Sequence, residues 1–519
     1  MESLSTKEYR NEFVTNFDGD ESGSLLSRQT PGKLYSKAIP TPVKAPALLA
    51  WSEGLADELG IKKPTDQKDI NILGGNLITS SMSPYAACYA GHQFGNWAGQ
   101  LGDGRAITLG EWQNGSNQSW EMQLKGAGPT AYSRRADGRA VVRSSLREYL
   151  MSEAMYHLGV PTTRALSLVG TGDDVMRDMF YDGHADYEPG AIVMRVAPSF
   201  LRFGNFEMLA ARDEVENLTK LVKWTIEKFY PHIAGKDKII RWFKEVVART
   251  ATLMVEWSRV GFVHGVMNTD NMSVLGLTID YGPYSFVDEY DPDFTPNTTD
   301  LPAKRYAFGR QASVAKWNLG CLGGAIAPLF ANTDELVAAL DEYDEIYLKK
   351  FYTMMGNKLG LDKVRVPDVD LIKDFEKMLS TLKPDMTIFY RRLMEIPSSV
   401  ENVEEVISHF TDSFYTAPDA FKAESLFHLM DSYQLRLKAN TGSREESLMM
   451  MKAANPYFIP RNYLLHQAIE ALGNGDNDLF IKLQQAIKEP CSDKYAEFFA
   501  KRPNWANAKA GCSMLSCSS

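Results

Sequence analysis

The order in which strand-like and helix-like apolar patterns follow one another limits the folds open to this chain. Strand-like patterns come early, at residues 119–125, 165–170 and 191–197. Helix-like spacing marks one segment between them and then dominates, at residues 143–159, 213–230, 238–260 and nearly everything after about residue 315. A small sheet with one helix, followed by a helical region, is therefore predicted, and the fold class is α+β.

The bulk composition excludes several classes of protein. The chain has 519 residues, 44% of them hydrophobic and 24% charged, which is ordinary for a globular protein of roughly two to four domain-sized units. A net charge of −10 argues against nucleic-acid binding through a basic face. No apolar run reaches the roughly 20 residues that cross a bilayer, so no membrane partner is expected. The acidic first 21 residues are unlike a signal or transit peptide, which predicts a cytoplasmic location.

Residues 261–282, with the sequence GFVHGVMNTDNMSVLGLTIDYG, carry the spacing of a protein-kinase catalytic loop with one residue replaced. His264 and Asn271 keep that spacing, and a DYG triplet beginning at Asp280 follows where a kinase has Asp-Phe-Gly. The position of the catalytic aspartate is Val266. The loop and the order of patterns predict a bilobal protein-kinase-like fold, with a small sheet lobe, a helical lobe and a helical C-terminal extension. The loop alone leaves open an inactive kinase or a site with different chemistry.

Asn271 and Asp280 are candidate metal ligands. A divalent cation that bridges phosphates prefers a carboxylate and an amide oxygen from neighbouring loops. The segment between them, MSVLGLTID, predicts two short strands with a tight turn at Gly276 that bring the two side chains together. A DYG triplet by itself is more often a turn, but the spacing of His264 and Asn271 favours a metal site.

Lys125 ends the predicted strand EMQLK, and Glu148 lies in the next predicted helix. In kinases this arrangement orients a lysine toward phosphates through a carboxylate. A helix capping box beginning at Ser145 explains Glu148 equally well from sequence alone. The Gly-Ala-Gly sequence at 126–128 would let a ligand approach the backbone beside Lys125.

Other candidate residues have two interpretations each. In LGDGRAI, residues 101–107, the pair Asp103-Gly104 is first a hairpin signal and second a phosphate loop. Arg195 and Arg202 need anionic partners because their surroundings are apolar, and either phosphates or a structural salt bridge would serve. Asp270 could replace the missing base or could orient the metal ligands, and its position does not decide.

The cysteines show no CxxC pair and no spaced Cys/His set, so neither a structural zinc site nor a disulfide framework is expected. They are Cys88, Cys321, Cys491, Cys512 and Cys517.

Four long segments resemble the selenoprotein O family nearly residue for residue. They are YAGHQFGNWAGQLGDGRA, MQLKGAGPTAYSRRADGRAVVRSSLREYLMSEAM, VMRVAPSFLRFGNFE and HGVMNTDNMSVLGLTIDYGP. The likeness runs through about residues 80–320 and is weaker in the flanks. It implies a protein-kinase-like fold that binds ATP turned around in its cleft and transfers AMP, with release of pyrophosphate, to Ser, Thr or Tyr hydroxyls of proteins.

The resemblance also implies a role for each candidate residue. The nucleotide-binding residues would be Gly102, Gly104, Arg105, Lys125, Asp137, Gly138, Arg195 and Arg202. Glu148 would be the partner of Lys125, Asn271 and Asp280 would bind Mg²⁺ or Mn²⁺, and Asp270 would be the catalytic base.

Cys517 fits the place, third from the C-terminus, where family members carry a redox residue. In some bacterial members this cysteine is expected to pair with one in the loop that here reads YGPYSFVDEYDPDFTPNTTD, residues 281–300. That loop has no cysteine, and Pro296 stands at the corresponding place, which argues against a disulfide switch of that type.

These observations predict a soluble, metal-dependent protein adenylyltransferase that uses ATP as co-substrate. The alternatives are a phosphotransferase with Asp270 as base and a nucleotide-binding scaffold without activity. Four units are expected: an N-terminal extension (1–80), a sheet-rich nucleotide-binding lobe (81–210), a helical lobe with the catalytic and metal-binding loops (211–355) and a helical C-terminal region (356–519).

Overall fold

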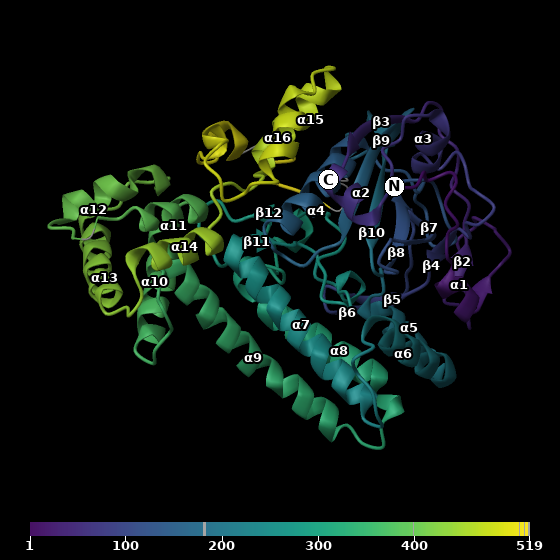
Figure 1. The fold of residues 1–519 in the computed structure, drawn as a ribbon, viewed down its shortest axis with the longest axis horizontal. Helices are drawn as coiled ribbons and strands as arrows, with labels where there is room; N and C mark the ends of the chain where they lie inside the picture. The colour runs from purple at the N-terminus through teal and green to yellow at the C-terminus, as the bar shows by residue number, and fades with distance from the viewer. Residues whose placement is uncertain (180–182, 398, 508, 513, 517–519) are drawn as a thin grey trace.

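A computed structural model describes the chain except residues 180–182, 398, 508, 513 and 517–519, so the predicted redox residue Cys517 lies outside the described residues. Figure 1 shows a twisted sheet on one side, long helices beneath it and a cluster of shorter helices on the other side. The predicted class, α+β, is confirmed. No described helix is both long and apolar enough to span a bilayer.

The main sheet contains eight strands within the described part of the chain. Neighbouring strands are antiparallel except for the first two, which are parallel. In spatial order they are β1 (Gly19–Asp20), β2 (Tyr35–Lys37), β4 (Tyr85–Ala87), β7 (Ala106–Gln113), β8 (Ser119–Lys125), β10 (Asp186–Ala197), β9 (Arg164–Arg177) and β3 (Ala47–Trp51). Two small sheets pair β5 (Ala90–Gln93) with β6 (Asn96–Gln100) and β11 (Phe262–Val263) with β12 (Ser285–Phe286).

The three strands predicted at 119–125, 165–170 and 191–197 all form, and they are neighbours in the main sheet. The segment 119–125 is β8, while 165–170 and 191–197 lie within β9 and β10. The C-terminal half of β10 is buried throughout, because β8 and β9 flank it and α4 packs on it. This burial explains its continuous apolar run, in place of the alternation that a half-exposed strand shows.

The predicted helices at 143–159, 213–230 and 238–260 correspond to α4, α6 and α7. The helices are α1 (Glu12–Asn16), α2 (Glu53–Leu59), α3 (Gln67–Leu73), α4 (Val142–His157), α5 (Phe203–Ala211), α6 (Val215–Phe229), α7 (Lys238–Val260), α8 (Gln311–Ile326), α9 (Asp334–Leu359), α10 (Asp368–Leu382), α11 (Met386–Met394), α12 (Val403–Phe410), α13 (Ala420–Lys438), α14 (Arg444–Ala454), α15 (Asn462–Gly473) and α16 (Asp478–Ala486).

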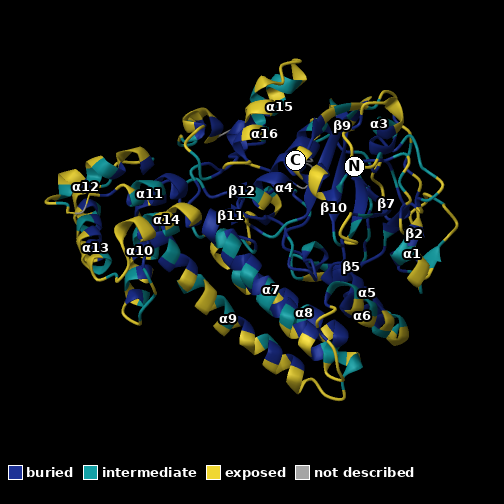
Figure 2. Cartoon of the chain, viewed as in Figure 1, coloured by how far each residue is buried: buried dark blue, intermediate teal, exposed yellow. Residues whose placement is uncertain are grey.

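Two hydrophobic cores hold these elements together. The larger core joins the sheet to α4–α9 and to the C-terminal helices α15 and α16, and it also includes N-terminal residues such as Leu4 and Phe13. The smaller core is formed by α10–α14 and the end of α9. Figure 2 shows the buried residues concentrated in the strands and on the inner helix faces, with exposed residues along the outer faces of α9, α12 and α13. The sheet and the helices beneath it therefore form one packed body.

A buried ion pair ties the segment before α15 to the start of α11. Arg461 Nη2 lies 2.8 Å from Asp385 Oδ1, and the two side chains are 3% and 0% exposed. Arg461 also contacts Asp288, and Asp385 accepts a hydrogen bond from Tyr415. Removal of one member would leave the other charge buried without its partner, which is far costlier than the loss of an exposed pair.

We therefore expect Asp385→Ala to lower the free energy of unfolding by about 3–5 kcal/mol in urea titrations. The control is Lys244→Ala, which breaks the exposed pair with Glu342 and should change this free energy by less than about 1 kcal/mol. Equal effects of the two substitutions would show that the buried pair does not join these parts of the fold.

Candidate functional site

A pocket of about 670 Å³ lies between the central strands and the segments that follow α7. All eight predicted nucleotide-binding residues line it, as do both predicted metal ligands; these are Gly102, Gly104, Arg105, Lys125, Asp137, Gly138, Arg195, Arg202, Asn271 and Asp280. Of the described lining residues, eight are Lys or Arg and four are Asp. A chain with a net charge of −10 thus places an excess of positive charge in one pocket.

Asp280 is the centre of the charge cluster in this pocket. Arg195 Nη1 lies 2.5 Å from Asp280 Oδ1, Arg202 contacts Oδ2, and Lys125 Nζ lies 3.8 Å from Oδ1. Burial alone would raise the pKa of Asp280, but Arg202, Arg195 and Lys125 outweigh it and hold the pKa well below its ordinary value. Asp280 is therefore ionised, and three cations converge on one carboxylate.

Lys125 forms the predicted pair with Glu148, at 2.8 Å between Nζ and Oε2. Glu148 does not line the pocket but reaches it through Lys125 and through Arg195, whose Nη1 lies 3.1 Å from Oε1. The capping-box interpretation is wrong, because α4 begins at Val142 and Ser145 is already inside its first turns. Burial lowers the pKa of Lys125, and Glu148 opposes that shift.

Strand register explains why these cations face one another. Arg195 on β10 lies opposite Gln123 on β8, and its guanidinium donates to the Gln123 side-chain oxygen. Lys125 is two residues beyond Gln123 and so points to the same face of the sheet. Arg202 lies after β10, where its backbone bridges to Ser273. A sheet face and a loop thereby present their cations to the same carboxylate.

The segment between Asn271 and Asp280 differs from its prediction. The turn at Gly276 is present, with a φ of +70°, but neither of the two short strands predicted beside it forms. Instead, Ser273 bridges to Arg202 and Thr278 bridges to Thr162. The segment is thus held by the sheet side of the molecule, which the local sequence pattern could not indicate.

Asp280 has a φ of 58°, in the left-handed region that few residues other than glycine adopt. Aspartate tolerates this region better than most side chains, and here the two arginines hold its carboxylate in place.

His264 forms hydrogen bonds to both of the segments that carry the candidate metal ligands. Its Nε2 donates to the carbonyl of Ile279 at 2.8 Å, and its Nδ1 accepts from the Val266 N–H at 3.3 Å. Burial lowers the pKa of His264, which suits the neutral ring that these two bonds require. The Asn271 Nδ2 group donates to the Val266 carbonyl at 2.9 Å, which fixes the orientation of the side-chain amide at the edge of the pocket.

The donor set fits a hard divalent cation. An ionised carboxylate at Asp280 and the amide oxygen of Asn271 both line the pocket and are the ligand types that Mg²⁺ and Mn²⁺ prefer. Both oxygens of Asp280 are engaged by arginines, so a bound cation would share the carboxylate with them or replace them.

Asp270 lies beside the pocket and does not line it. Its Oδ2 accepts from Gln93 Nε2 at 3.2 Å, and a Cβ atom at Gly91 would lie 2.8 Å from its Oδ1. Burial raises the pKa of Asp270 to about 6, although the charge of Arg202 opposes the shift. The side chain thus faces β5, and the residue is only 8% exposed. Contact with the pocket therefore gives no support to its predicted role as a base.

The glycines that line the pocket are fixed by close packing. A Cβ atom at Gly102 would lie 2.5 Å from the Tyr132 ring, and one at Gly138 would lie 2.1 Å from the Gly128 carbonyl oxygen. The hairpin interpretation of Asp103-Gly104 is wrong, because β6 and β7 on either side belong to different sheets. Asp103 is 4% exposed, and its Oδ2 accepts from the Ala87 N–H at 3.3 Å.

Sequence reasoning missed four arginines that line the same pocket: Arg134, Arg135, Arg139 and Arg177. Arg177 Nη2 lies 2.8 Å from Asp137 Oδ1, so this arginine forms an ion pair with one of the predicted nucleotide-binding residues in the pocket wall. The basic run SRRADGRA, residues 133–140, was the sequence signal for three of these arginines.

The α+β fold and a pocket in which cations outnumber acids define a protein suited to a phosphate-bearing ligand. A family model described as protein adenylyltransferase SelO matches residues 26–488. The chain belongs to this family, and the predicted enzyme class, nucleotidyltransferase, is confirmed with it.

Relatives named protein nucleotidyltransferase YdiU match over nearly their whole lengths. The protein from Cytophaga hutchinsonii is 59% identical over 520 residues, which cover 100% of both chains. Those from Azoarcus sp. and Aromatoleum aromaticum are 50% and 48% identical, and in each case the match covers 98% of this chain and 99% of the relative.

The raised pKa of Asp270 predicts a specific dependence of stability on pH. The fold favours the protonated carboxyl, so its stabilising effect is complete below about pH 4 and is lost as the pH rises through about 6. We expect Asp270→Asn to match the wild type near pH 4 and to exceed its free energy of unfolding by up to about 3 kcal/mol near pH 8. Urea titrations across this range measure the difference. An unchanging difference would contradict the assignment, and the exposed Asp341→Asn is the control.

Proposed function

We propose that this chain transfers AMP from ATP to Ser, Thr or Tyr hydroxyls of proteins and releases pyrophosphate, with ATP reversed in a kinase-like cleft. The observation that carries the proposal is the convergence of Lys125, Arg195 and Arg202 on Asp280 in one pocket, while Val266 occupies the place of a kinase base.

The charge distribution suits pyrophosphate as the leaving group. When a hydroxyl attacks the α-phosphorus, negative charge develops on the bridging oxygen and on the β- and γ-phosphates. The Asp280 carboxylate is already surrounded by three cations, Lys125, Arg195 and Arg202. Phosphate oxygens of the nucleotide would take up these cations, and Asp280 would then be free to hold a cation itself.

The remaining pocket residues support this orientation. Gly102, Gly104 and Gly138 line the pocket without side chains, and close contacts with neighbouring segments exclude larger residues at these positions. Arg105 and the Asp137–Arg177 pair lie on the pocket wall and would contact the rest of the nucleotide. Glu148 orients Lys125 and Arg195 from behind.

Mg²⁺ or Mn²⁺ held by Asn271 and Asp280 would supply positive charge to the bridging phosphate oxygens. Asp270, with a pKa near 6, would accept a proton only if the protein substrate or the nucleotide brings the hydroxyl to it. We infer from its place beside the pocket that it acts more on the position of Asn271 and Arg202 than as a base; Arg202 Nη1 donates to its carbonyl oxygen at 2.7 Å.

We extend the proposal to the architecture. The sheet with α4 and α5 corresponds to the small lobe of a kinase, and α6–α9 correspond to the large lobe, with the pocket between them. Residues 1–80 would be an extension that adds β1, β2 and β3 to the edges of this sheet, and residues after 355 a helical addition.

ATP labelled on the α-phosphate in one sample and on the γ-phosphate in another separates the alternatives. We expect label to enter protein from the α-labelled ATP alone, with pyrophosphate released. Transfer from the γ-labelled ATP alone would replace the proposal with a phosphotransferase. Intact ATP bound without any transfer would instead make the chain a nucleotide-binding scaffold.

Asp280→Asn should reduce AMP transfer by about 100-fold or more, because the substitution removes the charge that would hold the cation while it keeps a side chain that tolerates a positive φ. Rates are measured at saturating ATP, with Asp341→Asn on the exposed face of α9 as the control. Rates within about twofold of the wild type would remove Asp280 from the proposed metal site.

A further inference from the structure

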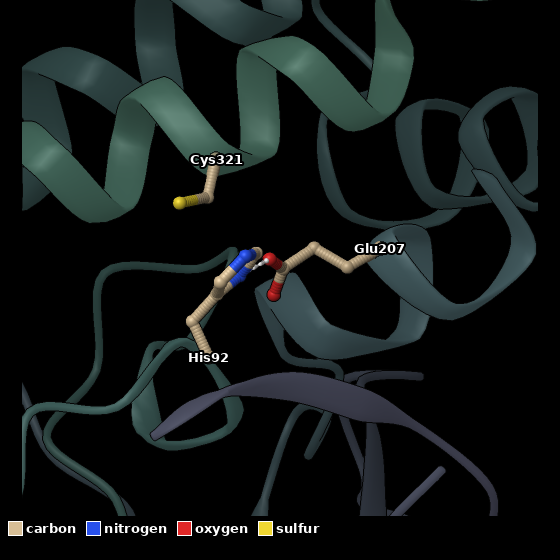
Figure 3. A group of neighbouring side chains, drawn as sticks. All are labelled: His92, Glu207 and Cys321. Atoms are coloured by element: carbon tan, nitrogen blue, oxygen red, sulfur yellow. Dashed lines mark hydrogen bonds and ion pairs between the residues drawn. The ribbon is translucent and has the colours of Figure 1, made fainter. Parts of the chain in front are cut away.

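Three side chains with metal-binding atoms meet outside the pocket. His92 comes from β5, Glu207 from α5 and Cys321 from α8, and Figure 3 shows them converging between these elements. One ligand atom from each lies within 4.8 Å of the other two. His92 Nδ1 and Glu207 Oε1 are 2.6 Å apart and share a hydrogen bond.

The chemistry of this set differs from that of the Asn271 and Asp280 pair. Imidazole nitrogen, carboxylate oxygen and thiolate sulfur together suit Zn²⁺, whereas Mg²⁺ prefers oxygen ligands alone. Three protein ligands with a water molecule in the fourth position is a common zinc arrangement, and the His92 side chain is 27% exposed, which gives water access.

The distances allow such a site after small movements. Ligand atoms in a tetrahedral zinc site lie about 3.5 Å apart, since the bonds are about 2.0–2.3 Å long. The three ligand atoms lie within 4.8 Å of one another, so no side of the triangle needs to shorten by more than about 1.3 Å. The His92 ring is already held between Trp97 and Trp317, at 5.0 and 5.4 Å between ring centres.

A second observation points to a ligand at this place. Among the described residues, Glu207 Oε2 is a buried oxygen without a hydrogen bond of normal geometry, although the nearby Thr269 hydroxyl favours the ionised form of Glu207 and opposes the rise in its pKa that burial causes. The Glu207 side chain is only 3% exposed. A buried carboxylate oxygen without a partner is costly, and native proteins rarely leave one unexplained. A hydrogen-bonded His–Glu pair accounts for Oε1 but not for Oε2 or for the thiol beside it. A cation accounts for all three groups.

We propose that His92, Glu207 and Cys321 bind a Zn²⁺ ion, with water as the fourth ligand. On binding, the Cys321 thiol loses its proton to the solvent as the Zn–S bond forms. The proton on His92 Nδ1 moves through the solvent to Nε2, so that a neutral imidazole and an ionised Glu207 become ligands.

The site would stabilise the loop next to the pocket. The His92 backbone N–H donates to Thr269 Oγ1 at 2.7 Å, and the next residue, Gln93, donates to Asp270. An ion that ties β5 to α5 and α8 would therefore fix the side of the 269–271 loop that faces away from the pocket. This inference is independent of the proposed AMP transfer, because its test reads metal binding and not activity.

Cobalt(II) is the probe, because it replaces Zn²⁺ and absorbs light in a way that reports thiolate ligands. The full-length protein is freed of metal with a chelator and titrated with Co²⁺. We expect a thiolate-to-cobalt charge-transfer band that saturates at one equivalent per chain and that Zn²⁺ abolishes. Mg²⁺ ions should leave the band unchanged. Absence of the band at saturating Co²⁺ would overturn the proposal.

Variants then identify the ligands. Cys321→Ser should abolish the band, and Cys491→Ser, at another partly buried thiol, should leave it intact. His92→Gln and Glu207→Gln should weaken Co²⁺ binding by more than the roughly 10–100-fold that loss of an outer-shell partner causes. Circular dichroism verifies that each variant is folded. A band that persists in Cys321→Ser, or unchanged affinity in His92→Gln, would overturn the assignment.

Discussion

The ion pairs of Asp280 with Arg195 on β10 and with Arg202 after this strand organise the rest of the pocket. Arg195 and Arg202 are 1% and 2% exposed, so their charges need a partner to remain buried. Asp280 supplies it, and in doing so it joins the sheet to the segment after α7. Glu148 places Lys125 in the same cluster. The phosphates of a bound nucleotide would replace Asp280 as the anionic partner of these cations, so no new cationic site would be needed.

The same exchange explains why an apolar residue, Val266, can stand at the position of the kinase aspartate. In a kinase, the acceptor hydroxyl is placed by an aspartate at this position. Here an apolar side chain lines the pocket, and the cations gather around Asp280. A site of this kind is suited to stabilising pyrophosphate as the leaving group, and this role does not require a base at the kinase position. His264 keeps the loop in place through its two backbone hydrogen bonds, so the kinase-like spacing has a structural role even where the catalytic aspartate is gone.

Much of the fold could be predicted because the deciding signals are local. Apolar periodicity placed β8, α4 and α7 within a few residues, but it found only the buried parts of the longer strands β9 and β10. The errors arose where distant segments decide. The capping box at Ser145 looked complete in sequence, yet α4 starts earlier; the Asp103-Gly104 hairpin failed because its flanking strands join different sheets. The cluster of His92, Glu207 and Cys321 was invisible for the same reason, since its members are more than 100 positions apart. The roles assigned to the pocket residues stay predictions.

The most direct test of the central claim is a crystal structure with a non-hydrolysable ATP analogue and Mg²⁺. The account predicts that the β- and γ-phosphates contact Lys125, Arg195 and Arg202, that Asp280 has left the arginines for the cation, and that the α-phosphorus faces the open side of the pocket. An adenine ring seated against these cations, with the γ-phosphate at the open side near Val266, would contradict it.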